Sequence, residues 1–238
     1  QNAERLAINP ELFKDTITLN VTLRPEESKK ISDMLIGVFF EDINYGADGG
    51  LYAELVQNRD FEYSPNDIGR EENWTATNSW STGGEGLSFD IDTMASLHAH
   101  NPHYAVLDIK EKGHGLVNDG FDGIPVKAGE KYDFSVFARS TSNKRGRIIV
   151  RLFDEDGKTI GEARTGKISK TWNKLTAVVE ATGSAVNGCI EVIPDMEGEV
   201  NLDMVSLFPQ KTFKNRKNGM RADLAQAIAD IRPRFVRF

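Results

Sequence analysis

The sequence has almost no cysteine and no long apolar run. Cys189 is the single cysteine among 238 residues, which excludes an internal disulfide framework and a cysteine-based zinc site. A helix needs about 20 consecutive apolar residues to span a bilayer, and no stretch of this sequence approaches that length. We therefore expect no membrane span.

Basic residues are in deficit. The chain has 29 Lys and Arg against 36 Asp and Glu, a formal net charge of -7. Nucleic acids and anionic membranes bind basic faces, so neither is expected as the main partner. Hydrophobic residues make up 39% of the chain, which excludes a wholly disordered protein. The length suits one large domain or two ordinary ones.

The first 60 residues contain two different strand patterns. Residues 16–23 alternate between polar and apolar side chains, which indicates a half-buried strand. Residues 34–40 are almost continuously apolar, which is typical of a parallel strand buried on both faces, and Glu41 and Asp42 follow at its carboxyl end. A short helical turn is predicted over residues 51–57.

From about Glu62 onward, short strands recur with Gly, Asn or Asp between them. Within residues 131–140, Tyr132, Phe134, Val136 and Ala138 take every second position. Strands are predicted over 87–91, 104–110, 131–140, 147–154, 172–181, 188–193 and 200–208. Strands at this spacing indicate an antiparallel sandwich or jelly roll of about 145 residues.

An α/β pattern returns after Pro209. Asn218 is the predicted cap of a helix that ends before Pro233, and residues 235–238 form a second apolar strand. The apolar stripe of this helix consists of Met220, Leu224, Ile228 and Ile231. The predicted fold class is mainly β, an antiparallel sandwich inserted between the first two strands of an α/β fold. Because the sequence stops on a strand, we expect a fragment.

Two stretches, one near each end of the chain, carry a family pattern. They comprise residues 36–42 (IGVFFED) with 49–62 (GGLYAELVQNRDFE), and residues 223–230 (DLAQAIAD) with 233–238 (PRFVRF). This pattern resembles glycoside hydrolase family 51, the α-L-arabinofuranosidases. The resemblance implies an incomplete (β/α)8 barrel and retaining hydrolysis of terminal arabinofuranosyl groups by two glutamates.

The same resemblance assigns roles along the chain. It implies an N-terminal strand region over 1–30, the first barrel strand and its loop over 31–61, the sandwich over 62–208, and the first barrel helix with the second strand over 209–238. Both catalytic glutamates would lie beyond Phe238. No catalytic residue and no catalytic cofactor is therefore expected in this chain, and the fragment alone is predicted to be inactive.

Two residues of the resemblance belong to the sugar subsite. Glu41 matches a glutamate that hydrogen-bonds the arabinose hydroxyls, a role that suits a charge-assisted acceptor. Arg237 matches an arginine that lies beneath the active site and helps to hold the catalytic carboxylates. The alternatives are an ordinary exposed acid for Glu41 and a buried structural ion pair for Arg237.

The inserted sandwich has a resemblance of its own. Residues 58–62 (NRDFE), Trp74 and residues 201–207 (NLDMVSL) look like the opening and closing strands of jelly-roll carbohydrate-binding modules with a galactose-binding-like fold. The resemblance implies a structural Ca²⁺ held by Glu62 and Asp203, with Asp60 less suited. The alternative is a set of salt bridges or hydrogen bonds at paired strand ends.

Trp80 is the predicted sugar platform of the sandwich. It is flanked by Ser79, Ser81, Thr82, Gly83 and Gly84, a loop composition that favours an exposed ring able to stack on a pyranose. Trp172 opens a strand and is expected in the core. Burial is the alternative for each tryptophan. The implied partner is an arabinose-containing polysaccharide of the plant cell wall.

Three functions stay open at this point. The chain is the N-terminal part of an arabinofuranosidase, a stand-alone carbohydrate-binding protein, or a structural buttress without a ligand. Gln1 in the first position, where a signal could have been removed, and a polymeric substrate favour a secreted, periplasmic or cell-surface location. No oligomeric state is predicted.

Overall fold

The computed structural model describes residues 20–64 and 74–238, in two compact units, Gln1–Leu35 and Ile36–Phe238. In the first unit, residues 20–35 contain the 3-10 turn η2 (Pro25–Glu27). Of the strand predicted over 16–23, residues 16–19 lie outside the described residues. Residues 20–23 form no strand, and Val21 and Leu23 are 72% and 84% exposed. That half of the prediction is wrong, because an apolar strand face needs a second layer to cover it.

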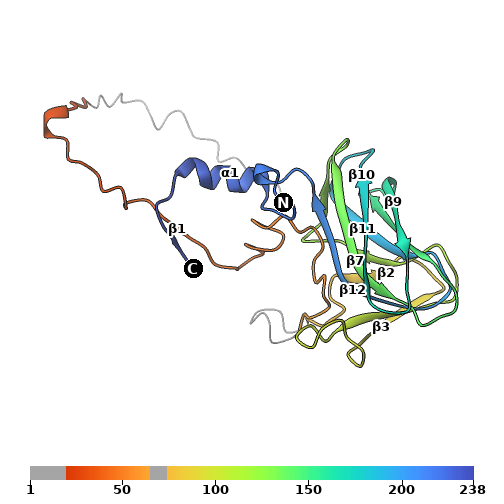
Figure 1. Ribbon diagram of the computed structural model, residues 1–238. Helices are drawn as coiled ribbons and strands as arrows, with labels where there is room; N and C mark the ends of the chain where they lie inside the picture. Colours follow the sequence, from red (N-terminus) through yellow and green to blue (C-terminus); the bar gives the residue numbers. More distant parts are fainter. Residues whose placement is uncertain (1–19, 65–73) are drawn as a thin grey trace, which may run out of the picture. The chain divides into compact units, whose positions relative to one another are not determined.

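The second unit contains two antiparallel sheets, which confirms the predicted sandwich (Figure 1). One sheet has the strand order β10-β7-β12-β4-β3, and the other β2-β5-β11-β8-β9 with β6 paired to β11. The strands are β2 (Trp80–Thr82), β3 (Leu87–Asp92), β4 (Tyr104–Ile109), β5 (Leu116–Asn118), β6 (Ile124–Val126), β7 (Lys131–Arg139), β8 (Arg147–Phe153), β9 (Thr159–Lys167), β10 (Asn173–Glu180), β11 (Ala185–Pro194) and β12 (Gly198–Pro209).

Alternation of side chains builds the core between the two sheets. In β7, Tyr132, Phe134, Val136 and Ala138 are buried, and the residues between them are half-buried on the outer face. Their partners across the core include Val150 of the other sheet, which is 0% exposed and belongs to the same hydrophobic cluster. The predicted strand over 131–140 therefore exists because one of its faces is buried and the other is not.

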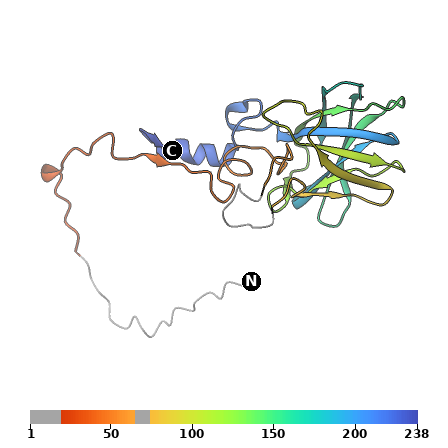
Figure 2. The same ribbon diagram turned by 90° about the horizontal axis from the view of Figure 1, so that it is seen from below.

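Two short parallel strands flank the sandwich in the sequence. β1 (Val38–Phe39) pairs in parallel with β13 (Val236–Arg237), with Val38 opposite Val236 (Figure 2). The predicted strands over 34–40 and 235–238 are confirmed in direction, although each is only two residues long. Burial on both faces is wrong, because this sheet has two strands and Phe39 is 53% exposed.

One helix, α1 (Ala222–Ile231), precedes β13. The predicted cap Asn218 is wrong, because residues 219–221 pair with other segments instead of entering the helix. Met220 bridges to Tyr52, and Arg221 bridges to Thr212 just before the 3-10 turn η3 (Phe213–Asn215). Arg221 takes the N-cap position without a side-chain capping bond.

The segment over 51–57 is extended rather than helical, so that prediction is also wrong. The backbone N–H of Ala53 donates to the carbonyl of Gly219 at 3.2 Å, and that of Leu55 donates to the carbonyl of Leu207 at 3.1 Å. Hydrogen bonds to distant parts of the chain replace the local bonds that a helical turn would form. The segment thereby joins the end of β12 to the residues that precede α1.

Glu54 holds this joint together. Its side chain is 0% exposed, and Oε1 accepts hydrogen bonds from the backbone N–H groups of Leu55, Val56 and Leu207 at 3.0, 3.1 and 2.8 Å. Oε2 accepts from the Ser206 hydroxyl at 2.7 Å and lies 3.5 Å from an Arg59 nitrogen. Burial raises the pKa of this carboxyl, and the hydrogen bonds oppose the shift. Residues 54–56 and the end of β12 are therefore fixed to one another by one carboxylate.

We expect Glu54→Ala to lower the free energy of unfolding by about 3 kcal/mol, because it leaves the backbone donors and Arg59 without their buried acceptor. Urea unfolding at pH 7 measures the change. Glu85→Gln, at an exposed glutamate, is the matched control and should change the midpoint little. An unchanged midpoint for Glu54→Ala would contradict the role of this carboxylate.

Candidate functional site

The outer face of the five-stranded sheet carries polar and aromatic side chains in two rows. Directly opposed residues of antiparallel strands share a face. One row consists of Asp90, Val106, Asn201 and Arg139, and Trp172 lies at its end just before β10. The next row consists of Asp92, Tyr104, Asp203, Phe137 and Lys174. Together the rows form the candidate site, which we call the outer sheet face.

An aromatic cluster capped by a cation lies on this face. The rings of Tyr104 and Trp172 meet edge to face, with centroids 5.4 Å apart and planes at 82°. The guanidinium of Arg139 lies 4.8 Å from the Trp172 ring centroid and 5.3 Å from that of Tyr104. Tyr104 is 1% exposed and Trp172 is half-buried. Trp172 thus presents the accessible ring, and the other two side chains fix its position.

Hydrogen bonds fix the orientation of the cluster. The Tyr104 hydroxyl donates to Asp92 Oδ2 at 2.8 Å, and the Trp172 indole N–H donates to the carbonyl of Ala95 at 2.9 Å. Burial, together with Asp92, raises the pKa of Tyr104. The hydrogen bonds from the Met94 backbone and from Tyr104 lower the pKa of Asp92. At neutral pH the pair is a neutral phenol that donates to a carboxylate.

Two buried polar atoms beneath the cluster have no hydrogen-bond partner. Among the described residues, Arg139 Nε and Asn201 Oδ1 are the two such side-chain atoms. They come from directly opposed residues of β7 and β12. One is a donor and the other an acceptor, so a single hydroxyl or water that both accepts and donates would satisfy them.

The sequence-based choice of platform is wrong for Trp80. Its side chain is 7% exposed, its indole N–H donates to the Asn58 carbonyl at 2.8 Å, and its ring lies 5.2 Å from that of Phe61. Trp80 is a core residue of β2. Trp172, expected in the core, occupies the outer sheet face instead. The outward position of Trp172 follows from its place in register with Arg139 on the paired strands. That register can be used only when the strand pairing is known.

Asp203, one of the two expected calcium ligands, is a buried carboxylate. It is 0% exposed, its Oδ1 accepts from the Met204 backbone N–H at 2.6 Å, and the Asn101 amide lies 3.2 to 3.3 Å from both oxygens. Burial, together with the charges of Asp60 and Glu62, raises its pKa to about 7. The three carboxylates are thus close enough to interact electrostatically.

Glu62, the other expected ligand, is engaged with His103. Its two oxygens contact the backbone N–H and Nδ1 of His103 at 2.9 and 2.5 Å. Within residues 20–64 and 74–238, no three His, Cys, Asp or Glu side chains converge on one point. Carboxylate oxygens and accumulated negative charge suit Ca²⁺ as a ligand. In this structure, however, the carboxylates of Glu62 and Asp203 accept hydrogen bonds from different protein groups and do not converge on one point.

The two expected subsite residues lie at the same end of the parallel pair. The Phe40 N–H donates to the Arg237 carbonyl at 2.9 Å, so Glu41 follows β1 at the level where β13 ends. The Arg237 guanidinium lies 4.8 Å from the Phe39 ring centroid. Glu41 and Arg237 are both exposed, and no hydrogen bond or ion pair joins them within the described part of the chain. The buried ion pair considered for Arg237 is therefore absent there.

The fold and these residues agree with a family assignment. A family of carbohydrate binding domains matches residues 53–194, more than half of the chain. The chain therefore belongs to this family of carbohydrate-binding domains.

The chain is also a relative of the α-L-arabinofuranosidases. It is 40% identical over 94% of its length to an extracellular exo-α-L-arabinofuranosidase of Streptomyces chartreusis, and 31% identical over 94% to α-L-arabinofuranosidase 1 of Arabidopsis thaliana. It covers 26% and 34% of those proteins. The structure of the arabinose-bound MgGH51 α-L-arabinofuranosidase matches 86% of this chain with 32% identity and a TM-score of 0.75, over 34% of that chain.

No helix among the described residues is both long enough and apolar enough to cross a membrane.

We expect the stability of the protein to depend on pH through Asp203. Its folded-state pKa of about 7 lies above the ordinary 3.8, so the folded protein holds this proton in the range between the two values. The cost of the buried charge is fully present above pH 7 and is relieved as pH falls towards 4. The free energy of unfolding should therefore rise by about 2–4 kcal/mol from pH 8 to pH 5 through this group.

Urea unfolding between pH 8 and pH 5 measures this slope in the presence of EDTA. Asp203→Asn should flatten the slope and be the more stable form at pH 8, whereas Asp156→Asn, at an exposed turn, should keep the slope of the original protein. Equal slopes for Asp203→Asn and the original protein would contradict the assignment.

Proposed function

We propose that this chain is the N-terminal part of an α-L-arabinofuranosidase and that its sandwich binds carbohydrate. The observation that carries the proposal is the similarity to such enzymes over 94% of the chain, which includes the sandwich and both flanking segments. The chain corresponds to only a quarter to a third of those relatives. Retaining hydrolysis needs two carboxyl groups about 5–5.5 Å apart, and we assign neither of them to this chain.

Glu41 and Arg237 are proposed to contribute to the sugar subsite. The support for both roles is the pairing of β1 with β13, which brings the carboxyl ends of two parallel strands to one edge. Active sites of (β/α)8 barrels lie at that edge. Glu41 would accept hydrogen bonds from arabinose hydroxyls, and Arg237 would position carboxylates supplied by a longer chain.

The outer sheet face is proposed as the carbohydrate-binding surface of the sandwich. A sugar stacks its apolar face on an aromatic ring while neighbouring polar groups orient its hydroxyls. Trp172 supplies the ring, Arg139 and Lys174 supply donors on the strands nearest to it, and Asp90 supplies an acceptor on β3 of the same face. The proposed ligand is an arabinose-containing plant polysaccharide such as arabinoxylan or arabinan, and the proposed location is outside the cytoplasm.

A structural Ca²⁺ near Asp203 and Glu62 is a further part of this proposal. Its support is the interacting negative charge of Asp60, Glu62 and Asp203 around a buried carboxylate. A bound cation would keep Asp203 ionised. About 5 mM Ca²⁺ at pH 8 should then raise the melting temperature of the protein and leave that of Asp203→Asn unchanged. Equal melting temperatures with and without Ca²⁺ would count against the ion.

A structural buttress is the second candidate function. It is favoured by the burial of Tyr104 and by the hydrogen bond that ties Trp172 to Ala95. Affinity electrophoresis separates the two functions. Retardation by arabinoxylan or arabinan supports binding, and migration unchanged by either polysaccharide supports the buttress.

We expect Trp172→Ala to weaken polysaccharide binding about five- to tenfold, because the stacking ring is lost. Trp172→Phe keeps an aromatic surface and should lose less. Thr159→Ala truncates an exposed side chain of β9 in the other sheet and is the matched control. Affinity electrophoresis measures binding and thermal unfolding checks each fold. Binding by Trp172→Ala that equals the control would exclude this face.

The 238-residue chain should show no hydrolysis of p-nitrophenyl α-L-arabinofuranoside, whereas a longer protein that continues through the barrel should be active. In that longer protein, Glu41→Gln should lower kcat/KM about ten- to a hundredfold, because a charge-assisted hydrogen bond to the sugar is lost. Asp42→Asn is the neighbouring control. Turnover by the 238-residue chain would exclude the assignment of the catalytic residues to a longer chain.

A further inference from the structure

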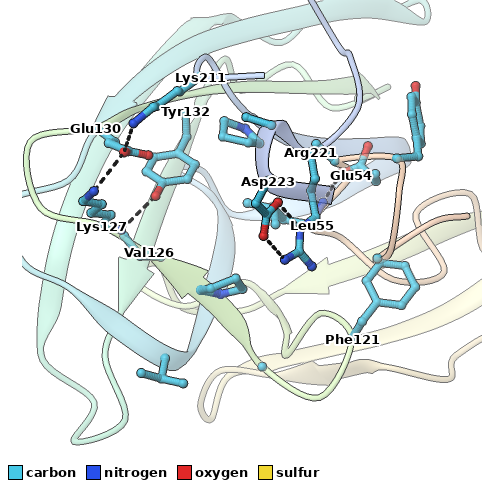
Figure 3. A pocket seen from close by; sticks show the side chains of 18 of the residues that line it. Glu54, Leu55, Phe121, Val126, Lys127, Glu130, Tyr132, Lys211, Arg221 and Asp223 are labelled. Atoms are coloured by element: carbon cyan, nitrogen blue, oxygen red, sulfur yellow. Dashed lines mark hydrogen bonds and ion pairs between the residues drawn. The ribbon is translucent and has the colours of Figure 1, made fainter. Parts of the chain in front are cut away.

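A cleft of about 610 Å³ lies apart from the outer sheet face. Three segments form most of its lining: the residues after β1, the loop and strand around β6 with the start of β7, and the connection from β12 into the first turn of α1 (Figure 3). Val186 of β11 completes the lining. Its volume lies in the range of small-molecule sites. Tyr104, Arg139 and Trp172 do not line it, so the cleft is a separate feature of the second unit.

Rigid aromatic rings form part of its wall. The Phe121 ring meets that of Tyr45 edge to face at 5.2 Å, and the Tyr52 ring meets that of Phe208 at 5.0 Å. Phe121 also packs on Gly49, where a β-carbon would lie 2.3 Å from the Phe121 ring. These contacts fix the rings before any ligand arrives, so a ligand would not have to order them.

Polar groups stand on two sides of the cleft. On one side Arg221 binds Asp223 through two hydrogen bonds of 3.1 and 2.7 Å. On the other side Lys127 and Lys211 approach Glu130 at 3.7 and 3.8 Å (Figure 3). Each side therefore offers both hydrogen-bond donors and acceptors.

The charges of the lining nearly cancel. Its carboxylates are Glu54, Asp122, Glu130 and Asp223, and its cations are Lys127, Lys211 and Arg221. The Glu54 carboxylate is bound by Ser206, Leu207 and Arg59 and does not need a ligand. A site with balanced ion pairs gives no net attraction to an anion or a cation. A hydroxyl group both donates and accepts, so a polyhydroxylated neutral molecule matches such pairs.

We propose that this cleft is a second carbohydrate site and that it binds a short neutral oligosaccharide. The ring of Phe121 packs against a sugar, and the pairs Arg221–Asp223 and Lys127–Glu130 orient its hydroxyls from opposite sides. This site is independent of the outer sheet face and goes beyond the function proposed above. It lies where the sandwich meets the segment that follows β1 and the segment that precedes α1, so a bound ligand would contact all three.

Nitrogen-15 NMR of the 238-residue chain tests the proposal with three probes: α-1,5-arabinotriose, xylotetraose and the anionic trigalacturonate. At least one neutral probe should shift the amide signals of Phe121, Lys211 and Arg221. Arg221→Gln should raise the Kd measured from these shifts about tenfold and leave the Kd measured from shifts at residue 172 unchanged. Trp172→Ala should raise the Kd at residue 172 and leave that of the cleft unchanged. Glu85→Gln is the matched control.

The outcomes separate this site from the outer sheet face. Shifts at the cleft that Arg221→Gln weakens support it, even when the signals of the sheet face do not respond. No shift at the cleft with 10 mM of either neutral probe overturns it, as does a response to trigalacturonate alone or a response that Arg221→Gln leaves unchanged. A loss of binding in Arg221→Gln counts only when its melting temperature equals that of Glu85→Gln.

Discussion

The buried carboxylate of Glu54 is the constraint on which the arrangement of the second unit depends. A charge without solvent is unfavourable unless several donors surround it, and here the donors come from residues 55–56, from Arg59 and from the end of β12. These parts of the chain can be fixed only together. The position of β12 sets the register of the five-stranded sheet, and the position of residues 53–55 sets one wall of the cleft. The Glu54 carboxylate therefore ties the end of β12, a strand of the five-stranded sheet, to one wall of the cleft.

The outer sheet face combines a rigid surface with polar groups that lack partners. Arg139 lies over the rings of Tyr104 and Trp172, so its guanidinium makes cation–π interactions with both. Its Nε and the facing Asn201 oxygen stay unpaired. Unpaired buried groups are unfavourable, and an ordered water that both accepts and donates would satisfy these two atoms. The carbohydrate contacts proposed for this face therefore depend on the accessible ring of Trp172 rather than on these atoms.

Regular alternation made much of the sandwich predictable. In β7 every second residue is buried, and the sequence alone identifies that strand. β2, β5 and β6 have three residues each, too few to show a period, and β9 contains Gly161 and Gly166. The candidate site was less predictable. Ser and Gly around Trp80 indicate a loop, but the carbonyl of Asn58, 22 residues away, holds the indole in the core. Trp172 is an apolar residue at the start of a predicted strand and is therefore expected in the core. Only the strand pairing shows that it faces outward.

The sandwich leaves the α/β segments and returns to them at neighbouring points of the chain. The backbone N–H of Ala53 donates to Gly219 and that of Leu55 donates to Leu207, so the segments by which the chain enters and leaves the sandwich lie side by side. The sandwich is therefore an insertion whose two ends lie close together, so its unfolding need not separate β1 from β13. Such an arrangement lets a whole module be gained, lost or exchanged during evolution without a change in the α/β segments that flank it.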